Sequence, residues 1–154
     1  MVDIPTVSIV IASAGMFVAA VYYILQIRNQ TKLRQTDLVM RLYSTFGSTE
    51  FQKVWKRFMT TEYKNYDDFV EKYGSWAPEA GFFLEGIGVL LKRNLIDIEL
   101  VDDLFSGPIK FAWEKFKAVA EDARKQLNYP EYAEHVEFLY NEMKKREQQQ
   151  AKIR

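Results

Sequence analysis

Few residues in this chain have the types and spacing that a catalytic or metal site requires. The sequence contains a single histidine, His135, and no cysteine. A carboxylate-bridged di-iron bundle needs two Glu-x-x-His pairs, but the residue three positions before His135 is Tyr132. The lack of cysteine excludes disulfides, thiolate catalysis and cysteine-containing zinc sites. We therefore expect no bound metal and no cofactor.

His135 has one acidic neighbour at helical spacing, Glu131, four residues earlier in the sequence. Two such side chains could supply two metal ligands, but a site needs more, so we expect a hydrogen-bonded surface pair. A Ser-His-Asp triad would have to use His135, and no nucleophile-elbow sequence is present. No glycine-rich phosphate loop follows a strand. We thus identify no catalytic residues and expect the chain not to be an enzyme.

One carboxylate, Glu85, lies inside an apolar run at 83–91, FLEGIGVLL. At helical spacing, Phe82 and Val89 lie beside Glu85, away from the main apolar face. Glu85 could be a buried acid in a ligand pocket. We expect instead that it lies at the rim of the packed face or forms an ion pair. Phe82, Glu85 and Val89 together form a possible partner surface.

The element that must position everything else is the uncharged stretch from Ile4 to Leu25. As a helix it would be about 33 Å long, which matches a hydrocarbon core of about 30 Å. A cleaved signal peptide is the alternative, because Ala12-Ser13-Ala14 resembles a cleavage site, but no basic segment precedes it. We predict a single membrane-spanning helix.

The charges that flank this stretch predict its orientation. Arg28, Lys32 and Arg34 follow it, whereas only Asp3 precedes it. Basic residues are retained on the cytoplasmic side, so we expect the N-terminus outside and the domain in the cytoplasm of a single-pass cell-membrane protein. The same three residues are expected to contact lipid headgroups.

Four small residues recur along the predicted membrane helix at spacings of four, three and four. Small side chains on one stripe let two helix backbones approach closely in lipid. Their number could equally reflect the general abundance of small residues in membrane helices. The predicted membrane helix contact consists of Ser8, Ala12, Gly15 and Ala19.

The rest of the chain is expected to be all-α, as a small bundle-like domain. No alternating β-branched run predicts a strand, and aromatic residues, 15% of the chain, can build a core. We divide the chain into an anchor (1–27), a connecting helix (28–47), a helical domain (48–143) and a polar helical tail (144–154). No glycine or proline lies between Met16 and Phe46, so one helix is expected from Pro5 to Phe46. The predicted core consists of Trp55, Phe83, Ile87, Leu90, Trp113, Phe116 and Leu139.

Local signals predict where the helices of the domain begin and end. Thr49 with Gln52, Asn65 with Asp68, and Asp97 have the form of helix N-caps. Gly47, Gly74 and Asn94 are residues that favour helix ends. Pro78 is expected to open a central helix that ends near Arg93, and Ser106-Gly107-Pro108 is expected to separate two further helices.

A resemblance to a protein family rests on three segments of the chain: FLEGIGVLL at 83–91, LIDIELVDDLFSGPIKFAWEK at 95–115 and YNEMKKREQ at 140–148. The chain resembles an uncharacterised family of short, largely archaeal and bacterial proteins with an N-terminal membrane helix and a helical domain of unknown function. The resemblance implies the same architecture and no activity, cofactor or site residue.

Two classes of function remain open. The formal net charge is zero, so no field would attract nucleic acid, and we expect no nucleic-acid partner. The class that we favour is a non-enzymatic, membrane-anchored interaction module, an accessory or scaffold subunit whose partners are membrane lipid and other membrane protein subunits. The alternative is a membrane-tethered enzyme or ligand sensor that uses carboxylates in a pocket, around Glu85 or around Asp102 and Asp103.

Overall fold

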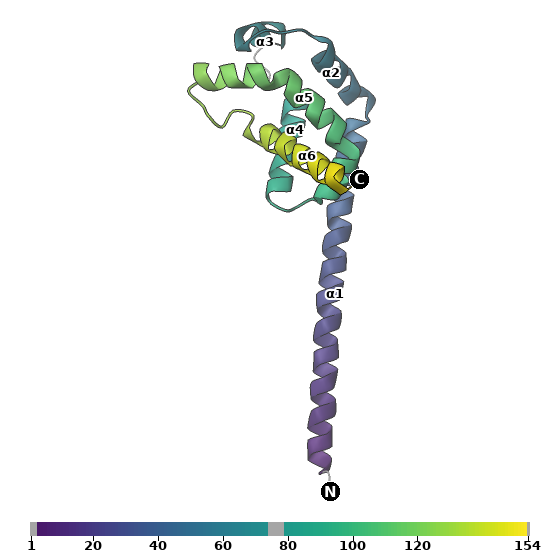
Figure 1. Cartoon of the computed structure of the whole chain (residues 1–154). Coiled ribbons are helices and arrows are strands. Elements are labelled where there is room, and N and C mark those ends of the chain that lie inside the picture. Colours follow the sequence, from purple (N-terminus) through teal and green to yellow (C-terminus); the bar gives the residue numbers. More distant parts are fainter. Residues whose placement is uncertain (1–2, 74–78, 154) are drawn as a thin grey trace.

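The structure is a computed structural model, and it describes residues 3–73 and 79–153. These residues form helices and connections without a strand, so the predicted all-α fold is confirmed. Figure 1 shows one long helix with a compact group of shorter helices at its end. The helices are α1 (Ile4–Phe46), α2 (Thr49–Thr60), α3 (Tyr66–Tyr73), α4 (Glu79–Lys92), α5 (Ile98–Gln126) and α6 (Glu134–Ile153).

Helix α1 is continuous over 43 residues, or about 65 Å at 1.5 Å per residue. The predicted anchor and connecting helix are therefore one element, and this helix is long and apolar enough to cross a membrane. Every described side chain from Ile4 to Arg34 is exposed. Contact with the domain begins at Gln35, whose Nε2 donates to the Asn94 carbonyl oxygen at 3.1 Å, and continues at the fully buried Val39.

The domain packs α4 against α6 and α2, while α5 contacts α6, α3 and α1. Three of the seven predicted core side chains, Ile87, Trp113 and Leu139, are at most 2% exposed. The other four are half-buried and pack against the same cluster: Trp55, Phe83, Leu90 and Phe116. The predicted core is confirmed, because none of its members is exposed.

Most of the predicted helix ends lie where the local signals placed them. Asn65 Oδ1 accepts from the Asp68 amide at 2.9 Å, and Asp97 caps α5 by accepting from the Glu99 amide at 2.7 Å. Asn94 has a positive φ of 55° after α4. The cap of α2 is Ser48 and not Thr49, since Ser48 Oγ accepts from the Phe51 amide. The expected helix end at Gly74 and helix start at Pro78 lie outside the described residues.

The predicted break at Ser106-Gly107-Pro108 is wrong, because α5 runs through it. Proline removes one backbone hydrogen bond and crowds the preceding turn, at a cost of about 3 kcal/mol in a helix interior. Phe105 and Ile109, on either side of Pro108, are both fully buried. Burial of a large apolar side chain contributes about 1.5–3 kcal/mol each, so packing on both sides of the proline offsets its cost.

A connection of seven residues, 127–133, separates α5 from α6. Ala133 has a φ of 57° and Asn128 a φ of 48°, so neither residue can lie within a right-handed helix. Tyr132 therefore precedes α6 instead of belonging to it, and α6 starts at Glu134. The connection between α5 and α6 lies against the side of α4, where the candidate site is found.

Candidate functional site

A cavity of about 450 Å³ lies between α4, α5 and the beginning of α6. Phe58 of α2, Ala112 and Phe116 of α5 and five residues of α4 contribute to its lining. The residues between α5 and α6 complete its rim. The lining residues are Phe58, Gly81, Phe82, Leu84, Glu85, Val89, Ala112, Phe116, Tyr129, Glu131, Tyr132, Ala133, Glu134, His135 and Val136.

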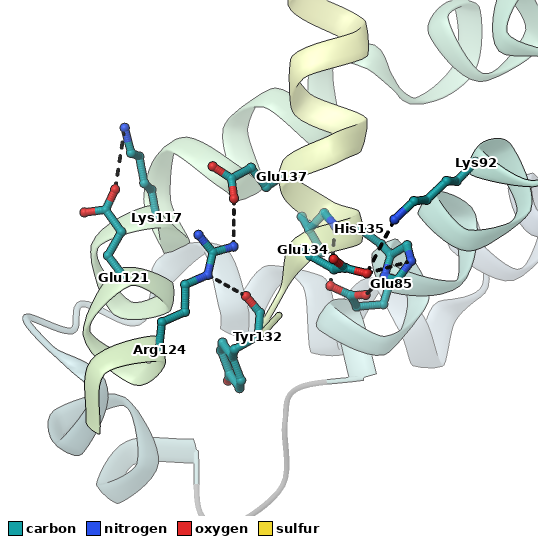
Figure 2. Close-up of polar contacts among 10 residues, drawn as sticks. Glu85, Lys92, Lys117, Glu121, Arg124, Tyr132, Glu134, His135 and Glu137 are labelled. Atoms are coloured by element: carbon teal, nitrogen blue, oxygen red, sulfur yellow. Dashed lines mark hydrogen bonds and ion pairs between the residues drawn. The ribbon is translucent and has the colours of Figure 1, made fainter. Parts of the chain in front are cut away.

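A polar cluster at one side of this cavity joins α4 to α6. His135 Nδ1 lies 3.0 Å from Glu85 Oε2, and His135 Nε2 lies 3.3 Å from Glu134 Oε1. The Lys92 ammonium lies 3.5 Å from the same oxygen of Glu134. Figure 2 shows these four side chains converging between the two helices. The imidazole can donate to both carboxylates only when both ring nitrogens carry a proton.

Glu85 also contacts the backbone at the start of α6. Its Oε1 accepts from the Val136 amide at 3.4 Å, one of the first amides of a helix, which have no partner within that helix. A carboxylate at this position is further favoured by the helix dipole. Glu85 is thus half-buried and in hydrogen-bond contact with a residue 50 positions away in the sequence.

The close packing of α4 on α6 depends on Gly88. A Cβ atom at this position would lie 2.5 Å from the His135 carbonyl oxygen and 2.8 Å from its carbonyl carbon. At Gly86, two residues earlier in α4, an added Cβ would meet nothing within 4 Å. Another helix therefore comes close to α4 at Gly88 but not at Gly86.

The connection before α6 is held in place by Arg124 of α5. Its Nε donates to the Tyr132 carbonyl oxygen at 2.9 Å, and its Nη2 donates to Glu137 at 2.7 Å (Figure 2). The Tyr132 ring forms part of the cavity wall. Burial, with smaller contributions from Tyr66 and Glu85, raises the pKa of Tyr132 to about 12. The phenol therefore stays protonated to a higher pH than that of an exposed tyrosine.

The structure brings the three residues of the possible partner surface to this cavity. Phe82 is 65% exposed at its rim, whereas Glu85 and Val89 are half-buried in its wall. The expected pair of Glu131 with His135 is wrong, because Glu131 precedes α6 and His135 contacts Glu85 and Glu134 instead.

The other carboxylates that we considered are not at the cavity. Asp102 Oδ2 accepts from Arg146 Nε at 3.0 Å and from Gln150 Nε2 at 3.3 Å. These contacts join α5 to the C-terminal part of α6, so Asp102 has a role in packing. Sequence reasoning missed His135 as the partner of Glu85. The available signals were that Glu85 is the one carboxylate inside an apolar run and that His135 is the single histidine of the chain.

The second candidate region is the exposed face of α1. An added Cβ at Gly15 would meet nothing within 4 Å, and Arg28, Lys32 and Arg34 are exposed. The spacing of the small stripe, alternately four and three, continues beyond it along the whole helix. The resulting strip, which we call the heptad strip, is exposed at every position: Ser8, Ala12, Gly15, Ala19, Tyr22, Gln26, Asn29, Leu33, Thr36, Met40 and Tyr43.

Comparisons with known proteins identify a family but no activity. The model of one protein family, described as a domain of unknown function (DUF4760), matches residues 9–143. The match therefore includes most of the apolar part of α1 together with the helical domain. Neither the curated proteins nor the solved structures contain a match to the chain.

Proposed function

This chain belongs to the DUF4760 family, and we propose that it is a non-enzymatic, membrane-anchored interaction module. Its anchor is α1, with the N-terminus outside the cell membrane and the domain in the cytoplasm. About 15 Å of helix separates Leu25 from Gln35, where the domain begins, so Arg28, Lys32 and Arg34 lie at the level of the lipid headgroups. The archaeal or bacterial origin implied by the resemblance also remains a prediction.

The observation that carries the proposal is the heptad strip, which continues past the membrane segment. Leu33 is 70% exposed and Met40 is 50% exposed, although both lie beyond Leu25, where the uncharged stretch ends. Lipid tails cannot cover these side chains if the apolar segment spans the bilayer. A second helix can cover them, because residues at this spacing form the seam of a coiled coil.

We assign the second helix to another copy of this chain. Insertion in one orientation makes two copies parallel, and a 3.5-residue repeat brings their strips together in a left-handed supercoil. Each heptad of such a pair has two seam positions, three residues apart. The residue just before the first of them lies opposite the partner's residue five positions further along the chain. Lys32 precedes Leu33, and five positions later the residue is Asp37. Opposite charges thus meet twice across the pair.

The residues along the strip fit both environments that it crosses. In the membrane, Ser8, Ala12, Gly15 and Ala19 permit the close approach that lipid-embedded helices use for association. Between membrane and domain, Gln26 and Asn29 occupy seam positions. Polar seam residues fix register at a cost in stability. The pair would hold two domains at a fixed height above the bilayer, as expected for an accessory or scaffold subunit.

The test uses two differently tagged copies of the full chain, expressed in the same cells and purified through one tag in mild detergent. Gly15→Ile should abolish recovery of the second tag, because the larger side chain separates the backbones. Insertion should be unaffected, since isoleucine is favourable in lipid. Ala14→Ile is the matched control: it adds the same side chain on another face and should leave recovery unchanged.

A charge exchange identifies the partner as a second copy. Lys32→Asp alone should lower recovery by about tenfold, because two attractive contacts become repulsive and each is worth up to about 1 kcal/mol. Adding Asp37→Lys should restore recovery. Equal recovery in all variants, or none in any, would refute self-association. Recovery of a different membrane protein that is lost with Gly15→Ile would retain the interaction module and replace the second copy as partner.

A further inference from the structure

The cavity beside α4 has the size and lining of a small-molecule site. Its volume of about 450 Å³ lies within the range of about 300–1,000 Å³ found for ligand pockets. Phe58, Leu84 and Val136 are buried around it, so a ligand entering from the rim would meet apolar side chains. Few polar groups reach it, which is typical of sites that bind a mainly apolar molecule in one orientation.

Aromatic rings from four parts of the chain contribute to this lining. They come from α2, α4, α5 and the connection before α6, so the fold gathers them from distant positions. A ring face carries partial negative charge and attracts an ammonium or guanidinium group within about 6 Å. The rings are those of Phe58, Phe82, Phe116, Tyr129 and Tyr132.

The titratable side chains at the polar side of the cavity are mainly carboxylates. They are Glu85, Glu131, Glu134 and His135, and no lysine or arginine is among the described lining residues. His135 lies against Glu85, and Lys92 lies against Glu134 from outside the lining. An anionic ligand would therefore meet carboxylates without a lysine or arginine to balance its charge.

Glu131 differs from the other two carboxylates of the lining. It is exposed at the rim, and its side chain takes part in no hydrogen bond or ion pair within residues 3–73 and 79–153. The Glu85 carboxylate already contacts His135 and the Val136 amide, so it joins α4 to α6. Glu131 is the carboxylate whose position leaves it available to a ligand, next to the rings of Tyr129 and Tyr132 in the lining.

We propose that this cavity binds a small, mainly apolar molecule that carries one ammonium group. The apolar body packs between Phe58, Leu84 and Phe116, and the ammonium group lies at the rim, near Glu131 and the tyrosine rings. The proposal is independent of pairing through α1, because the cavity is formed within one copy of the domain. It gives the interaction module a ligand that could alter how the first turn of α6 packs on α4.

The test is a calorimetric titration of the full chain in phosphatidylcholine nanodiscs, with empty nanodiscs subtracted. Three probes share a phenyl body: benzyltrimethylammonium is cationic, 2-methyl-1-phenyl-2-propanol is neutral with nearly the same shape, and phenylacetate is anionic. The cation should bind about tenfold more tightly than the neutral probe, from its interaction with the rings and Glu131, and phenylacetate least. Equal affinities, or no binding of the cation, would overturn the proposal.

Substitutions separate the charge from the cavity. Glu131→Gln should reduce the affinity for the cation to that for the neutral probe and leave the neutral probe unchanged, whereas Glu121→Gln, on the exposed side of α5, should change neither. Ala112→Leu and Val89→Phe should each fill the cavity and abolish binding of both probes. Unchanged cation affinity in Glu131→Gln, or binding that persists in a folded filled variant, would place the binding elsewhere and refute the assignment.

Discussion

The substitution Gly88→Ala tests whether the spacing between α4 and α6 is set by one missing side chain. The added Cβ would lie 2.5 Å from the His135 carbonyl oxygen, 2.7 Å from its Cβ and 2.8 Å from its carbonyl carbon. Two of these atoms are backbone, so no side-chain rotation can relieve the clash. Relief requires α6 to move away from α4 by about 1 Å, which also disturbs the contact between His135 and Glu85.

The expected loss of stability follows from two opposing terms. Overpacking a closely packed contact costs about 1–3 kcal/mol, and we take the upper value of about 3 kcal/mol because the obstacle is backbone. Alanine in place of glycine in a helix interior stabilises the folded state by about 1 kcal/mol. The net destabilisation for Gly88→Ala is about 2 kcal/mol. For a domain of this size, that corresponds to a fall in Tm of about 8 °C.

Gly86→Ala is the matched control, since it makes the same change in the same helix. Its Cβ would meet nothing within 4 Å, so only the gain of about 1 kcal/mol applies, and Tm should rise by about 4 °C. The assay is thermal unfolding of the detergent-solubilised chain followed by tryptophan fluorescence. Gly88→Ala with a Tm equal to or above that of the wild type would refute the described packing of α6 on α4.

Two further predictions concern the cavity wall and the membrane orientation. Burial raises the pKa of Tyr132 from 10.0 to about 12, so the unfolded chain loses this proton first, and stability should fall as the pH rises from about 10 to about 12. Tyr132→Phe should lessen the difference in Tm between pH 9 and pH 11; an unchanged difference would contradict this. Because the sequence lacks cysteine, Asp3→Cys should react with an impermeant maleimide in intact cells and Gln149→Cys should not. The opposite pattern would reverse the proposed orientation.

Features that depend on nearest neighbours along the chain could be predicted from the sequence. The uninterrupted α1 follows from an apolar stretch and from the absence of glycine and proline between Met16 and Phe46. The caps at Asn65 and Asp97 depend on a side chain that reaches an amide two or three residues later. Such contacts form within one turn of helix, so the residues that make them are visible in a short window of sequence.

The continuation of α5 through Pro108 could not be predicted in this way. Locally, Ser106-Gly107-Pro108 favours a break, and a proline in the helix interior costs about 3 kcal/mol. The burial of Phe105 and Ile109 against other helices offsets that cost. Whether this compensation exists depends on which surfaces α5 packs against, and the local sequence carries no record of them.

The sequence by itself singled out several residues of the candidate site but not their arrangement. It marked Phe82, Glu85 and Val89 on α4, and it marked His135 as the single histidine. Tertiary structure decided that Glu85 and His135 meet at 3.0 Å and that Glu131 lies at the cavity rim without pairing with His135. The physical reason is that Gly88 admits the backbone of α6 and that a positive φ at Ala133 delays its first turn. The first effect arises between segments about 50 residues apart, where helical periodicity no longer relates one side chain to another, and the second is a backbone conformation at a non-glycine residue that its side-chain type does not indicate.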